Sequence, residues 1–261
     1  MKFSIVTPVY NTEKYIAKAI DSVLSQKGDF EIEYIIQDGS STDQTVAIIK
    51  SYDKQLKTGL YPINCKSVTF HWTSEKDSGQ SDAINKGFKI ATGDIVAWLN
   101  ADDRYTQDAF QKISDIFKKG DDTVLVYGKC ISVCENGQII KENKPPVLIT
   151  RDLLINKGNL IFQPSSFYRR TSVESVKFLD SLLYYWMEYD LYIKLLSVGK
   201  SIFINDILSE FTVREGQKSD TKNIINMDKE LYSISRKYGG EIFSKIFFSN
   251  LWHKIIIIFK Q

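Results

Sequence analysis

The sequence contains few of the residues that build disulfide frameworks and zinc sites. Three cysteines and two histidines occur in 261 residues. An odd number of cysteines cannot all pair, and the spacing of Cys130 and Cys134 matches no common zinc motif. We therefore expect free thiols in a reducing compartment rather than a structural disulfide. His71 and His253 are isolated in the sequence, so neither is a convincing metal ligand.

The chain also lacks a strong charge excess, a signal peptide and a long uncharged apolar run. Its 34 basic and 32 acidic residues give a net charge of +2, which offers no basis for nucleic-acid binding through bulk charge. Pro8 and Asn11 interrupt the first apolar run before it reaches the length of a signal peptide, and no uncharged stretch of 18 residues follows. We expect a cytoplasmic protein.

Apolar strands alternate with amphipathic helices through the first 105 residues. Four short apolar runs predict strands at residues 3–9, 34–37, 68–72 and 95–99. Helices are predicted after the first three strands, and Asn11 or Thr12 is expected to cap the first helix. This alternation predicts an α/β fold with a mainly parallel sheet flanked by helices.

The pattern changes after a helix predicted over residues 107–118. Apolar runs near 124–128 and 138–140 indicate strands of a smaller, partly antiparallel region. The remaining predicted elements are a short helix near 151–156, a helix over 188–198, a strand over 201–204 and helical structure from 223 onward. We place the start of a C-terminal helical appendage at residue 219.

A pair of acids follows the fourth predicted strand. Asp102 and Asp103 come just after the apolar run 95–99, at the strand end where open α/β sheets bind ligands. Adjacent acids repel unless a cation or hydrogen bonds compensate, so a divalent metal carrying a phosphate is a natural partner. Considered alone, such a pair is more often a solvated turn. We expect Asp103 to be an exposed acid of the cleft.

Polar and aromatic residues follow the first two strands. Neighbouring strand ends share one crevice, so Tyr10 and Asp38 are placed to hold a nucleotide base and its ribose. The alternative is that Asp38 and Gly39 form a turn and that Asp43 is only an acid at a helix start.

Four motifs in a fixed order resemble glycosyltransferase family 2. They are TPVYN at 7–11, DGSSTD at 38–43, KDSGQSDAINKG at 76–87 and LNADD at 99–103. The resemblance covers roughly residues 1–215. It implies a GT-A fold with a Rossmann-like sheet, a nucleotide-diphospho-sugar donor, a Mn²⁺ or Mg²⁺ ion and inversion at the anomeric carbon. It also divides a GT-A domain, residues 1–218, into a nucleotide-sugar binding half, 1–105, and an acceptor half, 106–218, before the appendage 219–261.

The resemblance assigns donor and metal roles in the first half. It implies that Pro8 and Tyr10 shape the base pocket, that Asp38 contacts the base, and that Asp77 and Asp82 lie on the nucleotide side. In the acidic motif, Asn100 stands where many members carry Asp. Asp103 is the expected metal ligand, and Asp102 the expected ribose or second metal contact.

The resemblance places the catalytic base in the second half. A helix that opens with acids matches the family at Glu188, where many members carry Asp. Asp190, two residues on, points to a different helical face. Gln163 is expected to touch the acceptor. Arg214 is placed to reach the pyrophosphate with its planar fork. The alternatives are that Glu188 only interacts favourably with the helix dipole and that Arg214 is an ordinary surface residue.

These assignments predict a metal-dependent inverting glycosyltransferase, a hexosyl- or N-acetylhexosaminyltransferase of surface glycan assembly. Its partners would be a nucleotide-sugar donor and a glycan or lipid-linked acceptor, with no nucleic acid. A catalytically weak nucleotide-sugar-binding or scaffold protein is the alternative, favoured by Asn100 and Glu188. A nucleotidyltransferase is disfavoured because the first strand is followed by PVYN rather than by a glycine-rich phosphate loop.

The final segment, residues 242–261, is apolar and aromatic with intermittent lysines. It is suited to lie in a membrane interface, which would make the protein peripheral at the inner face of the membrane. The other interpretation is a helix that docks on the catalytic domain or on a second subunit.

Overall fold

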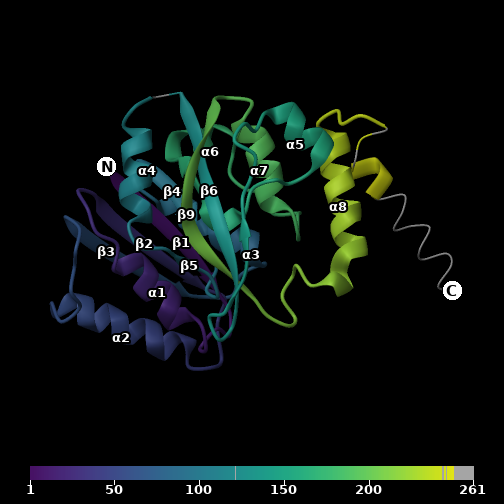
Figure 1. Ribbon diagram of the computed structural model, residues 1–261. Coiled ribbons are helices and arrows are strands. Elements are labelled where there is room, and N and C mark those ends of the chain that lie inside the picture. Colours follow the sequence, from purple (N-terminus) through teal and green to yellow (C-terminus); the bar gives the residue numbers. More distant parts are fainter. Residues whose placement is uncertain (121, 243, 245, 250–261) are drawn as a thin grey trace.

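The computed structural model describes residues 1–120, 122–242, 244 and 246–249 (Figure 1). Its strands form one sheet in the order β3-β2-β1-β4-β8-β6-β9-β5, with β7 paired to β6. The strands are β1 (Lys2–Val9), β2 (Glu31–Asp38), β3 (Ser67–Ser74), β4 (Ile95–Trp98), β5 (Arg104–Tyr105), β6 (Thr123–Cys134), β7 (Ile139–Asn143), β8 (Ser166–Arg169) and β9 (Lys200–Val213).

Helices flank this sheet on both faces. They are α1 (Ile16–Leu24), α2 (Thr45–Lys57), α3 (Gln80–Ile90), α4 (Ala109–Phe117), α5 (Arg151–Lys157), α6 (Arg170–Ser175), α7 (Met187–Leu195) and α8 (Ile224–Lys237), with short 3₁₀ turns at Gln163–Ser165 and Thr221–Asn223. Within the described residues, no helix combines the length and the apolar character needed to cross a membrane.

The first four strands pair in parallel, as the alternation of strands and helices predicts. β1 lies between β2 and β4, and β2 pairs with β3. The second half of the sheet is mixed: β8 runs antiparallel to β4 and β6, whereas β9 runs parallel to β6. The register sets Val9 opposite Asp38 and Asp38 opposite Ser74. The ends of three strands therefore meet at one edge of the sheet.

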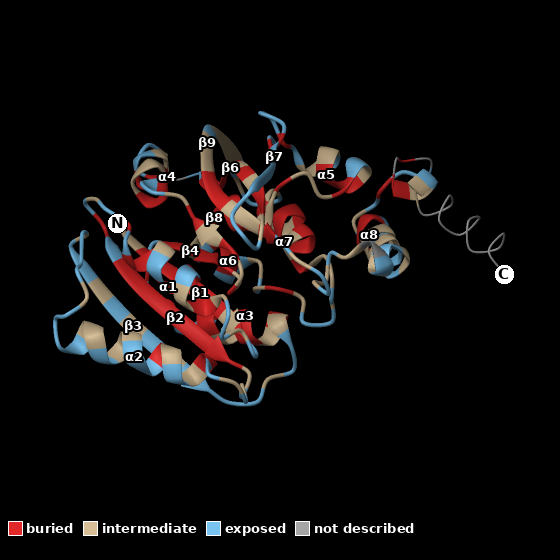
Figure 2. Cartoon of the chain, turned by 60° about the horizontal axis from the view of Figure 1, so that its bottom comes forward, coloured by how far each residue is buried: buried red, intermediate tan, exposed pale blue. Residues whose placement is uncertain are grey.

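Two apolar cores fill the spaces between the sheet and its helices. Side chains alternate along β1, so Phe3 and Ile5 pack with α1 and α4 on one face while Val6 packs with α3 on the other. Trp98 continues the second core toward α7. Figure 2 shows β1 and β2 as buried strands, while β3 and α2 present exposed residues at the outer edge.

The start of α1 differs from the prediction. The N–H groups of Tyr15 and Ile16 donate to the carbonyl of Thr12 at 2.9 and 3.0 Å. The Asn11 side chain instead accepts from the N–H of Thr42 at 2.8 Å, which joins the loops after β1 and β2. The predicted cap by an Asn11 or Thr12 side chain is therefore wrong, because the Asn11 side chain is used by the other loop and the Thr12 hydroxyl, which is buried, meets no hydrogen-bond partner among the described residues.

The last strand is much longer than its apolar run suggests. The prediction gave residues 201–204, whereas β9 spans Lys200–Val213 and pairs along β6 as far as Cys134. The polar residues Asn205 and Asp206 interrupt the apolar run, but the strand continues beyond them, where Glu210 and Ser209 pair with Arg104 and Tyr105 of the short strand β5. This length carries the chain from one end of the sheet to the acidic motif after β4.

The C-terminal helix α8 packs on the acceptor half. Ile234 is buried in the second core, with Leu231 against it, and the hydroxyl of Ser235 donates to the carbonyl of Ile155 at 2.7 Å. The domain boundary at residue 219 stays a prediction. Of the apolar segment 242–261, the described residues are 242, 244 and 246–249, and Ile246 among them is buried. The remainder lies outside the described residues, so the two interpretations of this segment stay predictions.

Candidate active site

Asp38 lies buried at the edge where β1, β2 and β3 end. Its carboxylate accepts from the N–H of Ser41 at 3.1 Å, from the hydroxyl of Ser41 and from the hydroxyl of Ser74 at 2.6 Å. These donors fix both oxygens of the carboxylate. Asp38 is thus part of a structured turn, as one interpretation expected, and it lies at the strand ends that the nucleotide prediction requires.

Asp77 is beside that turn. A Cβ atom placed on Gly39 would come within 2.7 Å of the Asp77 carboxylate, so a larger residue at position 39 would have to displace the Asp77 side chain. The other Asp77 oxygen accepts from the N–H of Gly79 at 2.9 Å. Asp82 accepts from the N–H of Ser78 at 3.1 Å. Both acids therefore shape the loop that leads into α3.

The two predicted residues after β1 are less enclosed. Pro8 pairs opposite Gln37 within the sheet, and the ring of Tyr10 is 63% exposed. An exposed aromatic ring beside a buried carboxylate is a suitable surface for a planar base. The structure thus brings Tyr10, Asp38 and Asp77 to the same strand ends.

The two adjacent acids lie in different environments. Asp103 is 1% exposed. One of its oxygens accepts from the N–H of Thr212 at 3.1 Å and the other from the side-chain amide of Asn100 at 3.2 Å. Burial, and then the charge of Asp102, raise the pKa of Asp103 well above its usual value. The expectation that Asp103 is an exposed acid of the cleft is wrong, because β9 covers it.

Asp102 faces a small open pocket and pairs with Arg214. Its Oδ2 atom lies 2.7 Å from Nε of Arg214, whose guanidinium stands over the Tyr15 ring at 5.3 Å. The pocket is lined by Tyr15, Lys18, Asp102, Arg104, Glu135 and Thr212. Arg214 therefore lies at the acidic motif, and its contact with the pyrophosphate stays a prediction.

The donor chemistry of this motif fits a Mg²⁺ or Mn²⁺ ion. Among the described residues, no group of three or more His, Cys, Asp or Glu side chains is arranged to hold a metal. Mg²⁺ commonly takes one or two protein carboxylates and completes its shell with phosphate oxygens and water. Asp102 provides such a carboxylate at the pocket, and Asp103 lies behind it.

Asn100 connects the acidic motif to the second half of the chain. Its amide nitrogen donates to Asp103, and its oxygen accepts from Gln80 at 2.7 Å. Gln80 in turn accepts from the ammonium of Lys218 at 2.8 Å. An Asp at position 100 would have no N–H to donate and would place a third acid in the cluster. The predicted acceptor residue Gln163 is also here: it donates to the Trp98 carbonyl at 2.7 Å.

Sequence reasoning missed Gln80 and Lys218. Lys218 also donates to the carbonyl of Tyr184 at 3.2 Å and stands 4.1 Å from the centre of the Tyr184 ring. Burial lowers the pKa of its ammonium, against the opposing effect of the acids Glu188 and Glu230. Neither residue has a sequence signal of its own, because each acts through a partner more than 100 positions away.

Glu188 lies in the first turn of α7 near Lys218. It keeps part of its surface accessible, and the side-chain amide of Asn159 donates to its Oε1 at 3.3 Å. Burial of the carboxyl raises the pKa of Glu188 to about 7, and the positive charge of Lys218 partly opposes this. A carboxyl group with a pKa near neutrality is suited to accept a proton at physiological pH.

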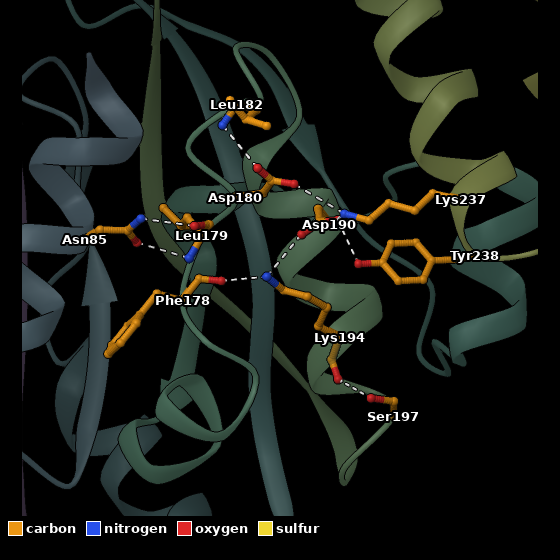
Figure 3. A network of polar contacts seen from close by, with 10 residues as sticks. All are labelled: Asn85, Phe178, Leu179, Asp180, Leu182, Asp190, Lys194, Ser197, Lys237 and Tyr238. Atoms are coloured by element: carbon orange, nitrogen blue, oxygen red, sulfur yellow. Dashed lines mark hydrogen bonds and ion pairs between the residues drawn. The ribbon is translucent and has the colours of Figure 1, made fainter. Parts of the chain in front are cut away.

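Asp190 occupies a different network, as the helical spacing predicts. Its side chain is fully buried. Figure 3 shows it among the ammonium groups of Lys194 and Lys237, each at 3.1 Å, and the hydroxyl of Tyr238 at 2.8 Å. Lys237 and Tyr238 come from the end of α8. Asp190 therefore joins α8 to α7, whereas Glu188 takes no part in this network and stays partly accessible.

Comparison with known proteins identifies the family. The model of glycosyl transferase family 2 matches residues 4–176. An uncharacterized glycosyltransferase of Nostoc, alr2836, is 31% identical over 186 residues, which are 69% of this chain and 54% of that protein. The minor teichoic acid biosynthesis protein GgaA of Bacillus subtilis is 28% identical over 239 residues, 89% of this chain and 48% of that protein. The chain thus spans about half the length of these relatives.

Solved structures show the same fold. The structure of Staphylococcus aureus TarS 1-349 in complex with UDP-GlcNAc matches with a TM-score of 0.67 and 20% identity, over 96% of this chain and 72% of that one. The mannosyltransferase PcManGT of Pyrobaculum calidifontis, in complex with GDP-Man and Mn²⁺, matches with a TM-score of 0.65 and 14% identity, over 95% and 68%. These likenesses confirm the predicted GT-A fold. With the family match over most of its length, the chain belongs to glycosyl transferase family 2.

Proposed function

We propose that this protein is a metal-dependent inverting glycosyltransferase. It moves a hexosyl or N-acetylhexosaminyl group from a nucleotide-diphospho-sugar to a hydroxyl group of a glycan or lipid-linked acceptor. The observation that carries the proposal is Glu188: its carboxyl has a pKa of about 7 and lies beside Lys218, which hydrogen bonds connect through Gln80 and Asn100 to the acidic motif. The proposed base in the acceptor half thus lies beside a series of hydrogen bonds that reaches the proposed donor site.

In the proposed reaction, Glu188 takes the proton of the acceptor hydroxyl. The oxygen attacks the anomeric carbon from the face opposite the leaving group, so the new C–O bond forms as the bond to the nucleoside diphosphate breaks. This single displacement inverts the anomeric centre. Asp102, backed by Asp103, would hold the divalent cation, which neutralises charge on the departing diphosphate. Arg214 adds a planar guanidinium suited to phosphate oxygens.

The relatives suggest a setting and a first donor to test. GgaA is named for minor teichoic acid biosynthesis. Another relative, S. aureus TarS, is named a poly(ribitol-phosphate) beta-N-acetylglucosaminyltransferase and is 28% identical over 177 residues, 66% of this chain and 28% of that protein. We therefore propose a role in bacterial surface glycan assembly, and UDP-GlcNAc is the first donor to assay.

Thermal unfolding with and without Mn²⁺ tests donor binding. A ligand that binds only the folded state raises the unfolding temperature, so UDP-, GDP- and dTDP-sugars are compared at equal concentration. Product analysis with the best donor then tests transfer. Metal-dependent stabilisation with inverted product supports the proposal. Stabilisation without any release of nucleoside diphosphate would favour the alternative, a nucleotide-sugar-binding or scaffold protein.

A further inference from the structure

A carboxylate of α8 holds the backbone just before the proposed base. Glu230 accepts hydrogen bonds from the N–H groups of three consecutive residues, Tyr184 at 2.9 Å and Tyr185 and Trp186 at 2.7 Å each. α7 begins at the next residue, Met187, and Glu188 is its second residue. The turn just before Glu188 is thus held by hydrogen bonds to an acid that lies 42 positions after Glu188 in the chain.

Further contacts hold the same turn. The indole N–H of Trp186 donates to the Met227 carbonyl at 2.8 Å, also in α8. Lys218, in the loop before α8, donates to the Tyr184 carbonyl. Free N–H groups at a helix start need acceptors, and a negative charge there is favourable. Glu230 accepts from the N–H of the N-cap residue Trp186 and from the two N–H groups before it, and it brings a negative charge to this end of the helix, so the position at which α7 begins depends on α8.

We propose that Glu230 is a positioning residue of the transferase, which fixes the start of α7 so that Glu188 meets Asn159 and Lys218 in the cleft. The proposal rests on the proposed function, because it needs Glu188 to be the base. Glu230 lies beyond the family match, which ends at residue 176. The C-terminal helix α8 would therefore take part in the reaction through Glu230.

The charged and titratable groups around Glu188 predict in which direction its pKa should move when Glu230 is replaced. Lys218 faces it from the loop after β9 and lowers its pKa, whereas the charge of Glu230 raises it. The buried hydroxyls of Tyr168 on β8 and Tyr192 on α7 also face Glu188. Removing the charge of Glu230 while leaving the others in place should lower the pKa of Glu188. A general loss of stability would lower the fraction of folded protein but would not move the Glu188 titration in the molecules that stay folded.

The test compares E230Q with E241Q and E230D in the full chain. E230Q keeps the size of the side chain, but it offers one acceptor oxygen instead of two and removes the charge. E241Q is the matched control, because Glu241 is an exposed acid beyond α8 and the substitution changes the net charge equally. E230D retains charge and both oxygens. Transfer rates are measured across pH, and the Glu188 titration is followed by carboxyl NMR, with its signal assigned from its loss in E188Q.

We expect kcat of E230Q to fall about 10-fold to 10²-fold, the scale of a misplaced catalytic group, with the donor KM little changed. The Glu188 titration should move to lower pH in E230Q and stay at the parent position in E230D and E241Q. An unmoved titration in folded E230Q, or a parent-like kcat, overturns the role of Glu230 alone. E188Q that transfers sugar at the parent rate overturns the base assignment, and the positioning role with it.

Discussion

The donor half and the acceptor half build their sites in different ways. In the donor half, the candidate groups follow the ends of adjacent parallel strands, and Asp38 is held by Ser41 and by Ser74 of the next strand. In the acceptor half, Glu188 depends on Asn159, Lys218 and Glu230, which come from separate loops and from α8. The surroundings of Asp38 are thus local to neighbouring strand and helix units, while the acidic motif, through Thr212 and Arg214, and the proposed base depend on long-range packing.

The two halves also differ in the groups that surround their buried acids. Asp103 and Asp190 are both enclosed, but Asp103 accepts from neutral N–H groups whereas Asp190 faces two ammonium groups. Their neighbours in the sequence, Asp102 and Glu188, are only partly buried. In the proposed function, the partly accessible acid of each pair acts on metal or substrate, while the enclosed acid holds the structure.

The largest expected effect is on the acceptor side. E188Q should reduce the transfer rate roughly 10²–10⁴-fold, the usual contribution of a positioned general base, with donor affinity little changed. D190N should instead lower the free energy of unfolding by about 1–3 kcal/mol, because it weakens a buried hydrogen-bonded network, while folded enzyme keeps its rate. Single-turnover transfer and urea unfolding measure the two. A dead D190N beside an active E188Q would reverse the two roles and place the base two residues on.

A second expected effect separates the two acids of the donor half. D102N should weaken Mn²⁺-dependent donor binding by about 10-fold to 10²-fold, the scale seen when metal-site partners are removed, because Asp102 faces the pocket. D103N should act mainly on stability, since Asp103 is covered by β9. Calorimetry of donor binding with and without Mn²⁺ compares them. Loss of metal dependence in D103N but not in D102N would restore Asp103 as the principal ligand.

The next effect is the pH dependence of transfer, for which we expect a change of about tenfold between pH 6 and pH 8. Glu188 must be ionised to accept a proton, and its pKa is about 7. The value of kcat/KM should therefore rise with pH through neutrality, with a rate at pH 6 about tenfold below that at pH 8. Rates are measured at saturating metal over this range. A profile that is flat between pH 5.5 and 8 would mean that Glu188 titrates elsewhere or is not the base.

The smallest expected effect concerns the local construction of the donor half. S74A removes one hydrogen bond to the Asp38 carboxylate, and Ser41 still supplies two. We expect donor affinity to fall about fivefold, equivalent to roughly 1 kcal/mol for one such bond, with no change in the pH profile. S249A, at a described serine remote from the strand ends, serves as the control. A larger loss in S74A than in D102N would mean that the donor half is not held locally.

Strand and helix order through residue 105 could be predicted because each unit carries its own pattern. The buried strands are short apolar runs, and each helix shows an apolar face at helical spacing. The length of β9 could not be predicted, because the strand is specified by pairing with β6 and β5 rather than by apolar side chains. The mistaken cap at Asn11 has the same origin: its side chain is used by Thr42 of another loop.

The sequence by itself determined the fold family, the order of the motifs and the types of residue at the site, because these depend on local pattern and on spacing along the chain. Only the tertiary structure decided which acid of each pair is enclosed. Asp103 is closed off by β9, and Asp190 is taken by Lys194 and by Lys237 of α8. Solvation and charge pairing are set by neighbours in space, and some of these neighbours, such as Thr212 and Lys237, lie many positions away in the chain.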